Sequence, residues 1–283
     1  MGDAGYFAAP VAGSGRALPP PPTGRSRRPL LLAAVPLVAL GSVLLVGSTL
    51  RGVRAAPAPG LHALTGPAPA AAGWSAEYVD DRGRPARWDP CTSVHYVVQA
   101  GWLPAAGRAD LARALRQLSA ASGLRFVDDG DTDEMPARVR RAYQPERYGA
   151  RWAPVLIGWV PAGSTDLPLG NGVQGVTAAV ALPGGSGGSL VTAEVAVDAS
   201  HPLAAGFGPG ETDGEVLLHE LAHAVGLGHV DDPTQVMYTS TTNAESRYGA
   251  GDRAGLAALG APAGCHPAPA PRALVLRAPG PGG

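Results

Sequence analysis

The stretch HELAHAVGLGHV, residues 219–230, decides how this sequence can fold and what chemistry it can carry. It holds three of the seven histidines of a 283-residue chain. His219 and His223 are four residues apart, so on a helix both imidazoles lie on one face and can reach a common ion. Glu220 points to the neighbouring side, where it can contact an ion-bound water without being a ligand. The spacing therefore predicts a helix that carries a metal site.

Gly226 and His229 complete the pattern. Gly226 lies three residues after His223 and can adopt a backbone conformation that turns the chain back, so that His229 closes the site. Three neutral imidazoles leave the fourth tetrahedral position to water, which is typical of a catalytic zinc and not of a structural one. With the residue frequencies of this chain, the pattern HExxHxxGxxH arises by chance with a probability of about two in a hundred thousand. We therefore predict one zinc ion on His219, His223 and His229, in preference to solvated or helix-capping histidines.

The segments around the motif indicate the fold class. Thr212 and Glu215 have the T-x-x-E spacing of a capping box and predict the start of the helix. Residues 107–122 form a second amphipathic pattern, because apolar residues recur there three and four positions apart. Apolar and β-branched runs predict strands at 94–100, 124–129, 155–160, 175–184 and 189–198, with a charged surface loop at 128–148 and a short last helix at 251–262. Strands with helices packed around them indicate an α+β fold.

The composition places these elements in one compact domain. Many of the 40 glycines and 29 prolines lie before residue 74 or after residue 266, which leaves 74–266 as a domain with a proper core. The formal net charge is −1, and no basic face stands out from this total, so we expect no nucleic-acid partner. The sequence leaves the oligomeric state open.

The N-terminal part predicts a membrane anchor. Residues 29–50 contain no charged residue and are long enough to cross a bilayer as a helix. Four arginines precede this span and two follow it closely, which favours a single-pass protein with its N-terminus inside the cell and its main domain outside. We expect a disordered cytoplasmic tail at 1–28, a transmembrane signal anchor at 29–50, a Pro/Ala-rich stalk at 51–73 and a flexible tail at 267–283. The alternative is a cleaved signal peptide, which would make the protein secreted, although its apolar region is usually shorter.

Cys91 and Cys265 are the two cysteines of the chain and lie near the ends of the predicted domain. From the sequence they are either two buried thiols or one covalent link. Both topologies above place the domain in an oxidising exterior, so we expect a Cys91–Cys265 disulfide.

HELAHAVGLGH resembles the zinc-binding signature of the metzincin metallopeptidases, and the following Met237 and Tyr238 are closest to its matrixin branch. RWDPCTSVHYVV (87–98) and GDRAGLAALG (251–260) also resemble small secreted matrixin-like proteins of actinobacteria. The resemblance implies a zinc protease domain with a twisted mixed β-sheet, an active-site helix and a Met-turn at Met237. It also implies that an extended peptide substrate pairs with strand 175–184.

Some features depart from that family. The propeptide cysteine switch of matrixins is absent, so we expect no such latency, while a zinc-blocking role for Cys91 stays an alternative. Structural zinc and calcium sites are not recognisable, although Asp198 and His201 have a spacing that such a site can use. Thr239 occupies the position of a tyrosine that can bind zinc in the astacin and serralysin branches. Tyr238 comes one residue too early, so no fifth ligand is expected.

Together these features predict a zinc-dependent endopeptidase that hydrolyses peptide bonds of extracellular proteins or peptides. One catalytic zinc ion would activate a water, and Glu220 would act as the general base, whereas a calcium site is left open. An alternative is an envelope-anchored zinc-binding adhesion or sensing module with little or no turnover, and zinc hydrolysis of a non-peptide bond is a third. Glu220 favours a hydrolase, because a structural zinc site does not need that carboxylate.

Overall fold

The computed structural model describes residues 61–63, 73–184, 187–208, 210–240 and 247–277. They belong to the second of two compact units of the chain, Val53–Gly283. The predicted cytoplasmic tail at 1–28, the predicted membrane span at 29–50 and most of the predicted stalk lie outside the described residues. Within the described ranges, no helix combines the length and the hydrophobicity that crossing a membrane requires.

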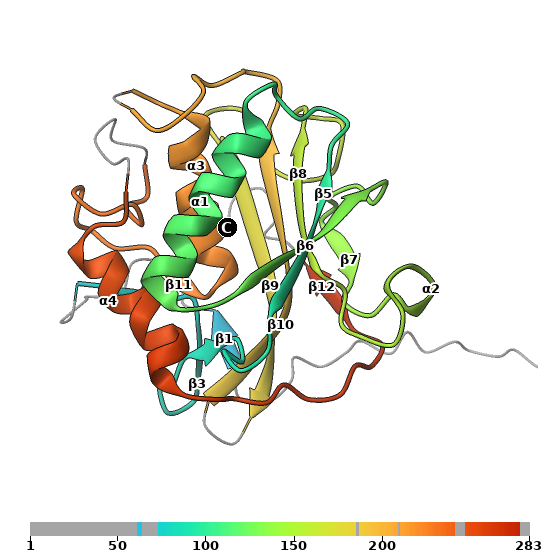
Figure 1. The fold of residues 1–283 in the computed structure, drawn as a ribbon, viewed down its shortest axis with the longest axis vertical. Helices are drawn as coiled ribbons and strands as arrows, with labels where there is room; N and C mark the ends of the chain where they lie inside the picture. Colours follow the sequence, from blue (N-terminus) through green and yellow to red (C-terminus); the bar gives the residue numbers. More distant parts are fainter. Residues whose placement is uncertain (1–60, 64–72, 185–186, 209, 241–246, 278–283) are drawn as a thin grey trace, which may run out of the picture. The chain divides into compact units, whose positions relative to one another are not determined.

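The centre of the domain is a mixed sheet with the order β9-β10-β8-β5-β6 (Figure 1), and the short β4 pairs with the start of β10. The strands are β4 (Ala86–Arg87), β5 (Val94–Gln99), β6 (Phe126–Thr132), β8 (Val155–Val160), β9 (Gly175–Gly184) and β10 (Gly187–Asp198). Neighbours are parallel except β9, which runs antiparallel to β10. Among the strands that the structure describes, β9 pairs only with β10, so its outer edge is left without a ladder.

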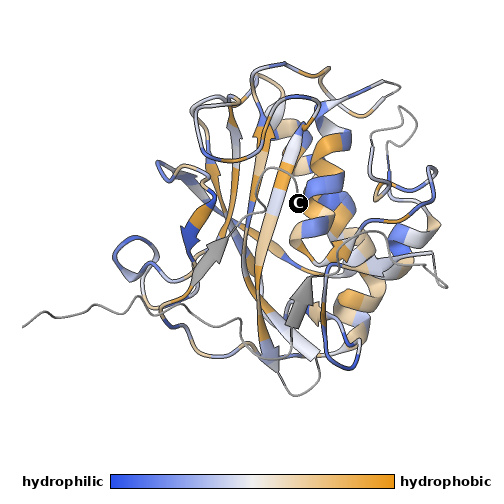
Figure 2. Cartoon of the chain, turned by 180° about the vertical axis from the view of Figure 1, so that it is seen from behind, coloured by the Kyte–Doolittle hydropathy of each residue, from blue (hydrophilic) through white to orange (hydrophobic). Residues whose placement is uncertain are grey.

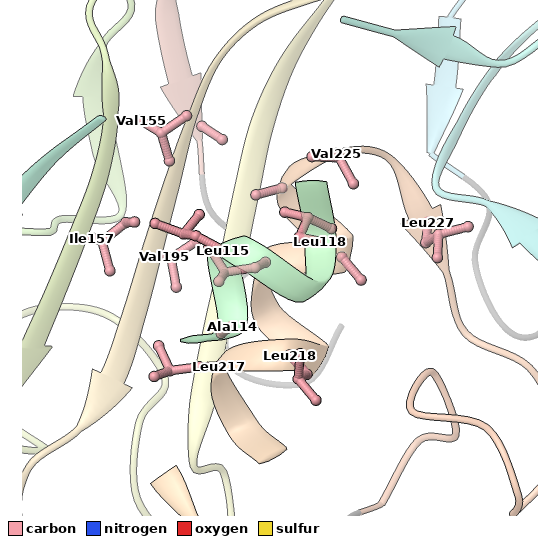
Figure 3. Packing of buried hydrophobic residues seen from close by; sticks show 14 of the residues in the cluster. Ala114, Leu115, Leu118, Val155, Ile157, Val195, Leu217, Leu218, Val225 and Leu227 are labelled. Carbon is pink, nitrogen blue, oxygen red and sulfur yellow. The ribbon is translucent and has the colours of Figure 1, made fainter. Parts of the chain in front are cut away.

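Helices cover one face of this sheet. α1 (Gly107–Ser122) and α3 (Asp213–Ala224) pack against each other, and α3 also contacts β9 and β10. α1 has the bounds that its apolar periodicity predicts. Its Leu115 lies close to Ile157 of β8 and Val195 of β10 in the main core (Figure 3). Burial of such side chains contributes about 1.5–3 kcal/mol each, so the core holds the helices firmly on the sheet.

A second, smaller core lies on the opposite face of the sheet. It consists of Val160, Leu167, Leu169, Val176, Ala178 and Ala196. The segment between β8 and β9 supplies two of these leucines, so it folds over the sheet. As a result β10 is buried along its whole length, which explains its nearly continuous run of small and apolar residues. Figure 2 shows the hydrophobic colour along the central strands and much of the helices.

The prediction of a surface loop at 128–148 was wrong in part. β6 extends into this segment beside β5, and β7 (Val139–Arg141) and a single turn of helix, α2 (Pro145–Tyr148), follow. Its charge suggested solvation, but Arg140 is 3% exposed and forms an ion pair with Glu134. Charged residues that pair with each other can therefore lie inside a structured segment.

The C-terminal segment also differs from the loose tail expected at 267–283. β12 (Val275–Arg277) pairs antiparallel with β7, and the indole N–H of Trp152 donates a hydrogen bond to the carbonyl oxygen of Pro269 at 2.9 Å. The backbone of this segment thus finds partners on the edge of β7, which the local sequence does not reveal. Residues 278–283 lie outside the described part.

A disulfide and short strand pairs fasten the two ends of the domain. Cys91 and Cys265 form the predicted disulfide across 174 positions, so Cys91 has no free thiol to offer to a zinc site. Near the other end, β2 (Ser75–Ala76) pairs with β11 (Leu227–Gly228), and β3 (Tyr78–Asp80) pairs with β1 (Leu61–Ala63). The last helix, α4 (Ala250–Leu259), contacts α1 and precedes a short 3₁₀ turn at Ala261–Ala263.

Candidate metal centre and active site

α3 begins and ends at the signals that the sequence contains. Thr212 Oγ1 accepts a hydrogen bond from the Glu215 backbone N–H at 3.2 Å, which satisfies one free donor at the start of the helix. Two residues beyond the helix, Gly226 has a φ of 101°, a conformation that favours glycine. A β-carbon there would also lie 3.1 Å from the carbonyl oxygen of Ala86. This turn leads through β11 to His229.

The three histidines of the motif converge on one point. Nε2 of His223 lies 3.1 Å from Nε2 of both His219 and His229, and the last two atoms are 3.2 Å apart. Nδ1 of His219 lies 2.7 Å from the carbonyl oxygen of Val236, and Nδ1 of His223 lies 2.7 Å from that of Leu227. A carbonyl oxygen only accepts, so both rings carry their proton on Nδ1 and present an Nε2 lone pair to the centre. Such an arrangement is stable around a cation.

The geometry and protonation of these rings fit zinc. With Zn–N bonds of about 2.0–2.1 Å, tetrahedral ligand nitrogens are about 3.3–3.4 Å apart, close to the distances seen here. Burial lowers the pKa of His219 and lowers that of His223 well below its usual value. Burial, followed by the charge of His219, lowers the pKa of His229 to about 4. The imidazoles are therefore neutral at pH 7, as metal binding requires, and the group can hold a metal ion.

Glu220 supplies a carboxylate next to this centre. Its side chain is 6% exposed, and its Oε2 accepts a hydrogen bond from Thr177 Oγ1 of β9 at 2.6 Å. Burial raises the pKa of Glu220 to about 7, and the bond from Thr177 acts in the opposite direction. A carboxyl group that titrates near neutrality can both accept and release a proton. The sequence singled out Glu220 but contained no signal for Thr177.

Met237 lies in a buried turn next to the third histidine. It is 1% exposed, and its carbonyl oxygen accepts a hydrogen bond from Val230 at 3.0 Å. The Asp252 carboxylate, in the first turn of α4, accepts hydrogen bonds from the backbone N–H groups of Val236 at 2.8 Å and Met237 at 3.3 Å. Because the Val236 carbonyl orients His219, Asp252 supports a ligand indirectly. In the sequence, Asp252 looked like an ordinary acidic residue at a helix start.

The N-terminal segment of the domain also reaches the site, which sequence reasoning missed. Ser75 Oγ donates a hydrogen bond to the carbonyl oxygen of His229 at 2.7 Å. Glu77 Oε2 lies 3.8 Å from Nδ1 of His223. Burial, and after it the charge of Glu220, raises the pKa of Glu77 to about 7. A second carboxyl group with a perturbed pKa therefore lies beside the centre, which is common at functional sites.

Asp198 and His201 lie beside each other, with Nδ1 of His201 3.7 Å from Oδ2 of Asp198, but within the described residues they belong to no group of three possible ligands. Asp198 Oδ1 accepts a hydrogen bond from the Ala162 backbone N–H at 3.2 Å, and the ring of His201 is 86% exposed. Apart from the three histidines, one further group of possible ligands occurs in the described ranges. It surrounds the disulfide, so its sulfur atoms are already bonded.

A mixed α+β domain in which one helix carries two converging histidines and a glutamate, with a third histidine after a glycine turn, has the architecture of a metzincin metallopeptidase. Residues 144–259 match the matrixin family, which supports a matrixin-like metzincin domain in this part of the chain. The match contains α3, α4, the three histidines and Met237. A search among curated proteins finds no match to the chain. Matrixins are zinc-dependent peptidases, and the histidine triad is the group here that can hold the metal.

Proposed function

We propose that this protein is a zinc-dependent endopeptidase that hydrolyses peptide bonds of extracellular proteins or peptides. One observation carries the proposal. Three imidazole Nε2 atoms lie 3.1–3.2 Å apart, and the residue after the first of them presents a buried carboxylate. A structural zinc site has no need of that carboxylate, whereas hydrolysis requires a group that moves a proton.

His219, His223 and His229 would hold the zinc, which would activate water and polarise the substrate carbonyl group. Glu220 accepts a proton from the attacking water and delivers it to the amine nitrogen as the C–N bond breaks. The burial of Glu220 supports both steps, because it raises the pKa of the carboxyl group to about 7. The Nδ1 hydrogen bonds to the Val236 and Leu227 carbonyl oxygens keep two of the rings from rotating.

The outer edge of β9 is the proposed binding surface for an extended substrate. β10 occupies the inner edge, and Thr177 of β9 contacts Glu220, so a peptide added to the outer edge would pass close to the carboxylate. The backbone N–H of Ala179 already donates a hydrogen bond to the Tyr78 hydroxyl at 3.2 Å. We therefore propose that substrate pairing uses the part of β9 before Ala179.

Removal of zinc should abolish peptide cleavage. The purified full-length chain with one equivalent of zinc is incubated with a diverse peptide library, and internal cuts are identified by mass spectrometry. A chelator should reduce the rate at least about 100-fold, because the metal activates both water and carbonyl, and added zinc should restore it. A zinc-loaded chain that cuts no peptide would contradict the proposal and favour a zinc-binding module, and hydrolysis of only a non-peptide bond would contradict it as well.

The proposed extracellular action fits the disulfide between Cys91 and Cys265, because such bonds persist in oxidising compartments. Protease treatment of intact cells of the native host should remove the domain and spare a tag placed before residue 29. Loss of the tag together with protection of the domain would show the opposite orientation. A mature chain that begins after residue 50 would instead show a cleaved signal peptide and a secreted enzyme.

A further inference from the structure

We propose that Thr177 is the positioning residue for Glu220. Its hydroxyl holds one carboxylate oxygen, Oε2, and leaves Oε1 as the oxygen that exchanges the proton. This inference deepens the peptidase function proposed above and rests on it. It assigns to β9 a second role, since the strand proposed to bind the substrate would also orient the general base.

The contact between the two side chains is short and specific. Thr177 Oγ1 lies 2.6 Å from Oε2 of Glu220 and 3.1 Å from the carbonyl oxygen of the same residue. A hydroxyl has a single proton, and the closer, charged acceptor takes it. The bond joins the edge strand of the sheet to the active-site helix across 43 positions of sequence. It therefore orients Glu220 relative to any peptide that pairs with β9.

Gly175 accounts for the position of the rest of the Glu220 side chain. It lies two residues before Thr177, so both residues lie on the same face of β9. A β-carbon on Gly175 would stand 2.5 Å from Oε1 of Glu220 and 2.6 Å from its Cγ. The glutamate thus occupies space that is available only because residue 175 has no side chain. Thr177 holds one oxygen by a hydrogen bond, and Gly175 leaves room for the other.

Two substitutions at residue 177 separate the hydroxyl from the shape of the side chain. Thr177→Val keeps the shape and removes the hydroxyl, whereas Thr177→Ser keeps the hydroxyl. If the hydroxyl positions Glu220, Thr177→Val should lower kcat about 10- to 100-fold, the usual size of a hydrogen bond to a charged group. KM should stay within about threefold, because the backbone of β9 is unchanged. Thr177→Ser should keep kcat within about threefold of the parent chain.

Gly175→Ala tests the same positioning of Glu220 by filling the space that its side chain occupies. The new methyl group should displace the carboxylate and lower kcat by at least about tenfold, since misplacement of a catalytic group by an ångström is costly. Gly208→Ala is the matched control, because a β-carbon there meets no atom within 4 Å. Its kcat should equal that of the parent chain. All four variants should bind about one zinc per chain, because none of these residues is one of the three histidines proposed to bind zinc.

Crystal structures of the full-length variants provide a readout independent of activity. The Glu220 carboxylate should keep its position in Thr177→Ser and leave it in Thr177→Val. Full kcat with an unmoved carboxylate in Thr177→Val would overturn the inference, as would a failure of Thr177→Ser to retain kcat or loss of zinc from Thr177→Val. A parent chain that binds zinc and cuts no peptide would refute the proposed function instead. The carboxylate positions would then still decide whether Thr177 holds Glu220.

Discussion

Glu220→Ala should leave about one zinc ion per chain and lower the rate of peptide cleavage by about 10²–10⁴-fold or more. The three imidazoles remain in place, so metal binding is retained, but no side chain is left to move the proton. Zinc content by atomic absorption and cleavage of a fluorogenic peptide are measured on the same preparations. Full cleavage by Glu220→Ala would refute the role assigned to this carboxylate.

The matched variants change the ligands and not the base. His219→Ala and His223→Ala each remove one of three proposed protein ligands whose Nε2 atoms lie 3.1–3.2 Å apart, so both should lose zinc or bind it much more weakly. Their cleavage should fall with their zinc content. Stoichiometric zinc in both histidine variants would refute the site itself. The pattern across the three variants thus separates metal binding from catalysis.

Loss of the disulfide should lower the free energy of unfolding by up to about 5 kcal/mol, because the bond closes a loop of 174 positions in the unfolded chain. The double variant Cys91→Ser, Cys265→Ser is compared with the parent by urea unfolding of the full-length chain. Chelator is present throughout, because bound zinc would add its own stabilisation. The double variant leaves neighbouring hydrogen bonds unchanged, including the bond that the backbone N–H of His266 donates to Asp89 at 3.0 Å, so the comparison measures the loss of the covalent link.

Each single variant, Cys91→Ser or Cys265→Ser, is the control for the change of side chain, and both should resemble the double variant. An unchanged urea midpoint in the double variant would contradict the stabilising role. Peptide mapping of the parent without reduction should show one linked pair, and two free thiols in protein from its native host would contradict the link.

Local patterns predicted the elements whose formation depends on local physics. The helix at Gly107–Ser122 and the strands at Val155–Val160 and Gly175–Gly184 have the predicted bounds, because apolar periodicity acts within each segment. The prediction of a surface loop at 128–148 was wrong in part. The charges of this segment indicated exposure to solvent, but Arg140 is buried among partners from other strands. Such pairing is decided by residues far away in the sequence.

The sequence by itself determined which three histidines come together in a group that can hold a metal ion. Helical geometry places His219 and His223 on one face, and Gly226 permits the turn that returns His229, so the spacing alone is sufficient. It also determined that Glu220 lies beside the metal centre. These relations hold because they span at most a few residues of one helix and the turn that follows it.

Only the tertiary structure decided how the site is supported. Thr177 on the edge strand, Asp252 on the last helix and Glu77 in the N-terminal segment reach the centre from separate parts of the chain. No local signal marks them, since each is an ordinary polar residue in its own segment. Their roles arise because tertiary contacts, which include the packing of α3 against β9 and the pairing of β2 with β11, bring segments that are far apart in the sequence to the histidines. The orientation and pKa of Glu220 therefore depend on the fold. The choice of Glu220 as the candidate general base, in contrast, follows from residues 219–230 alone.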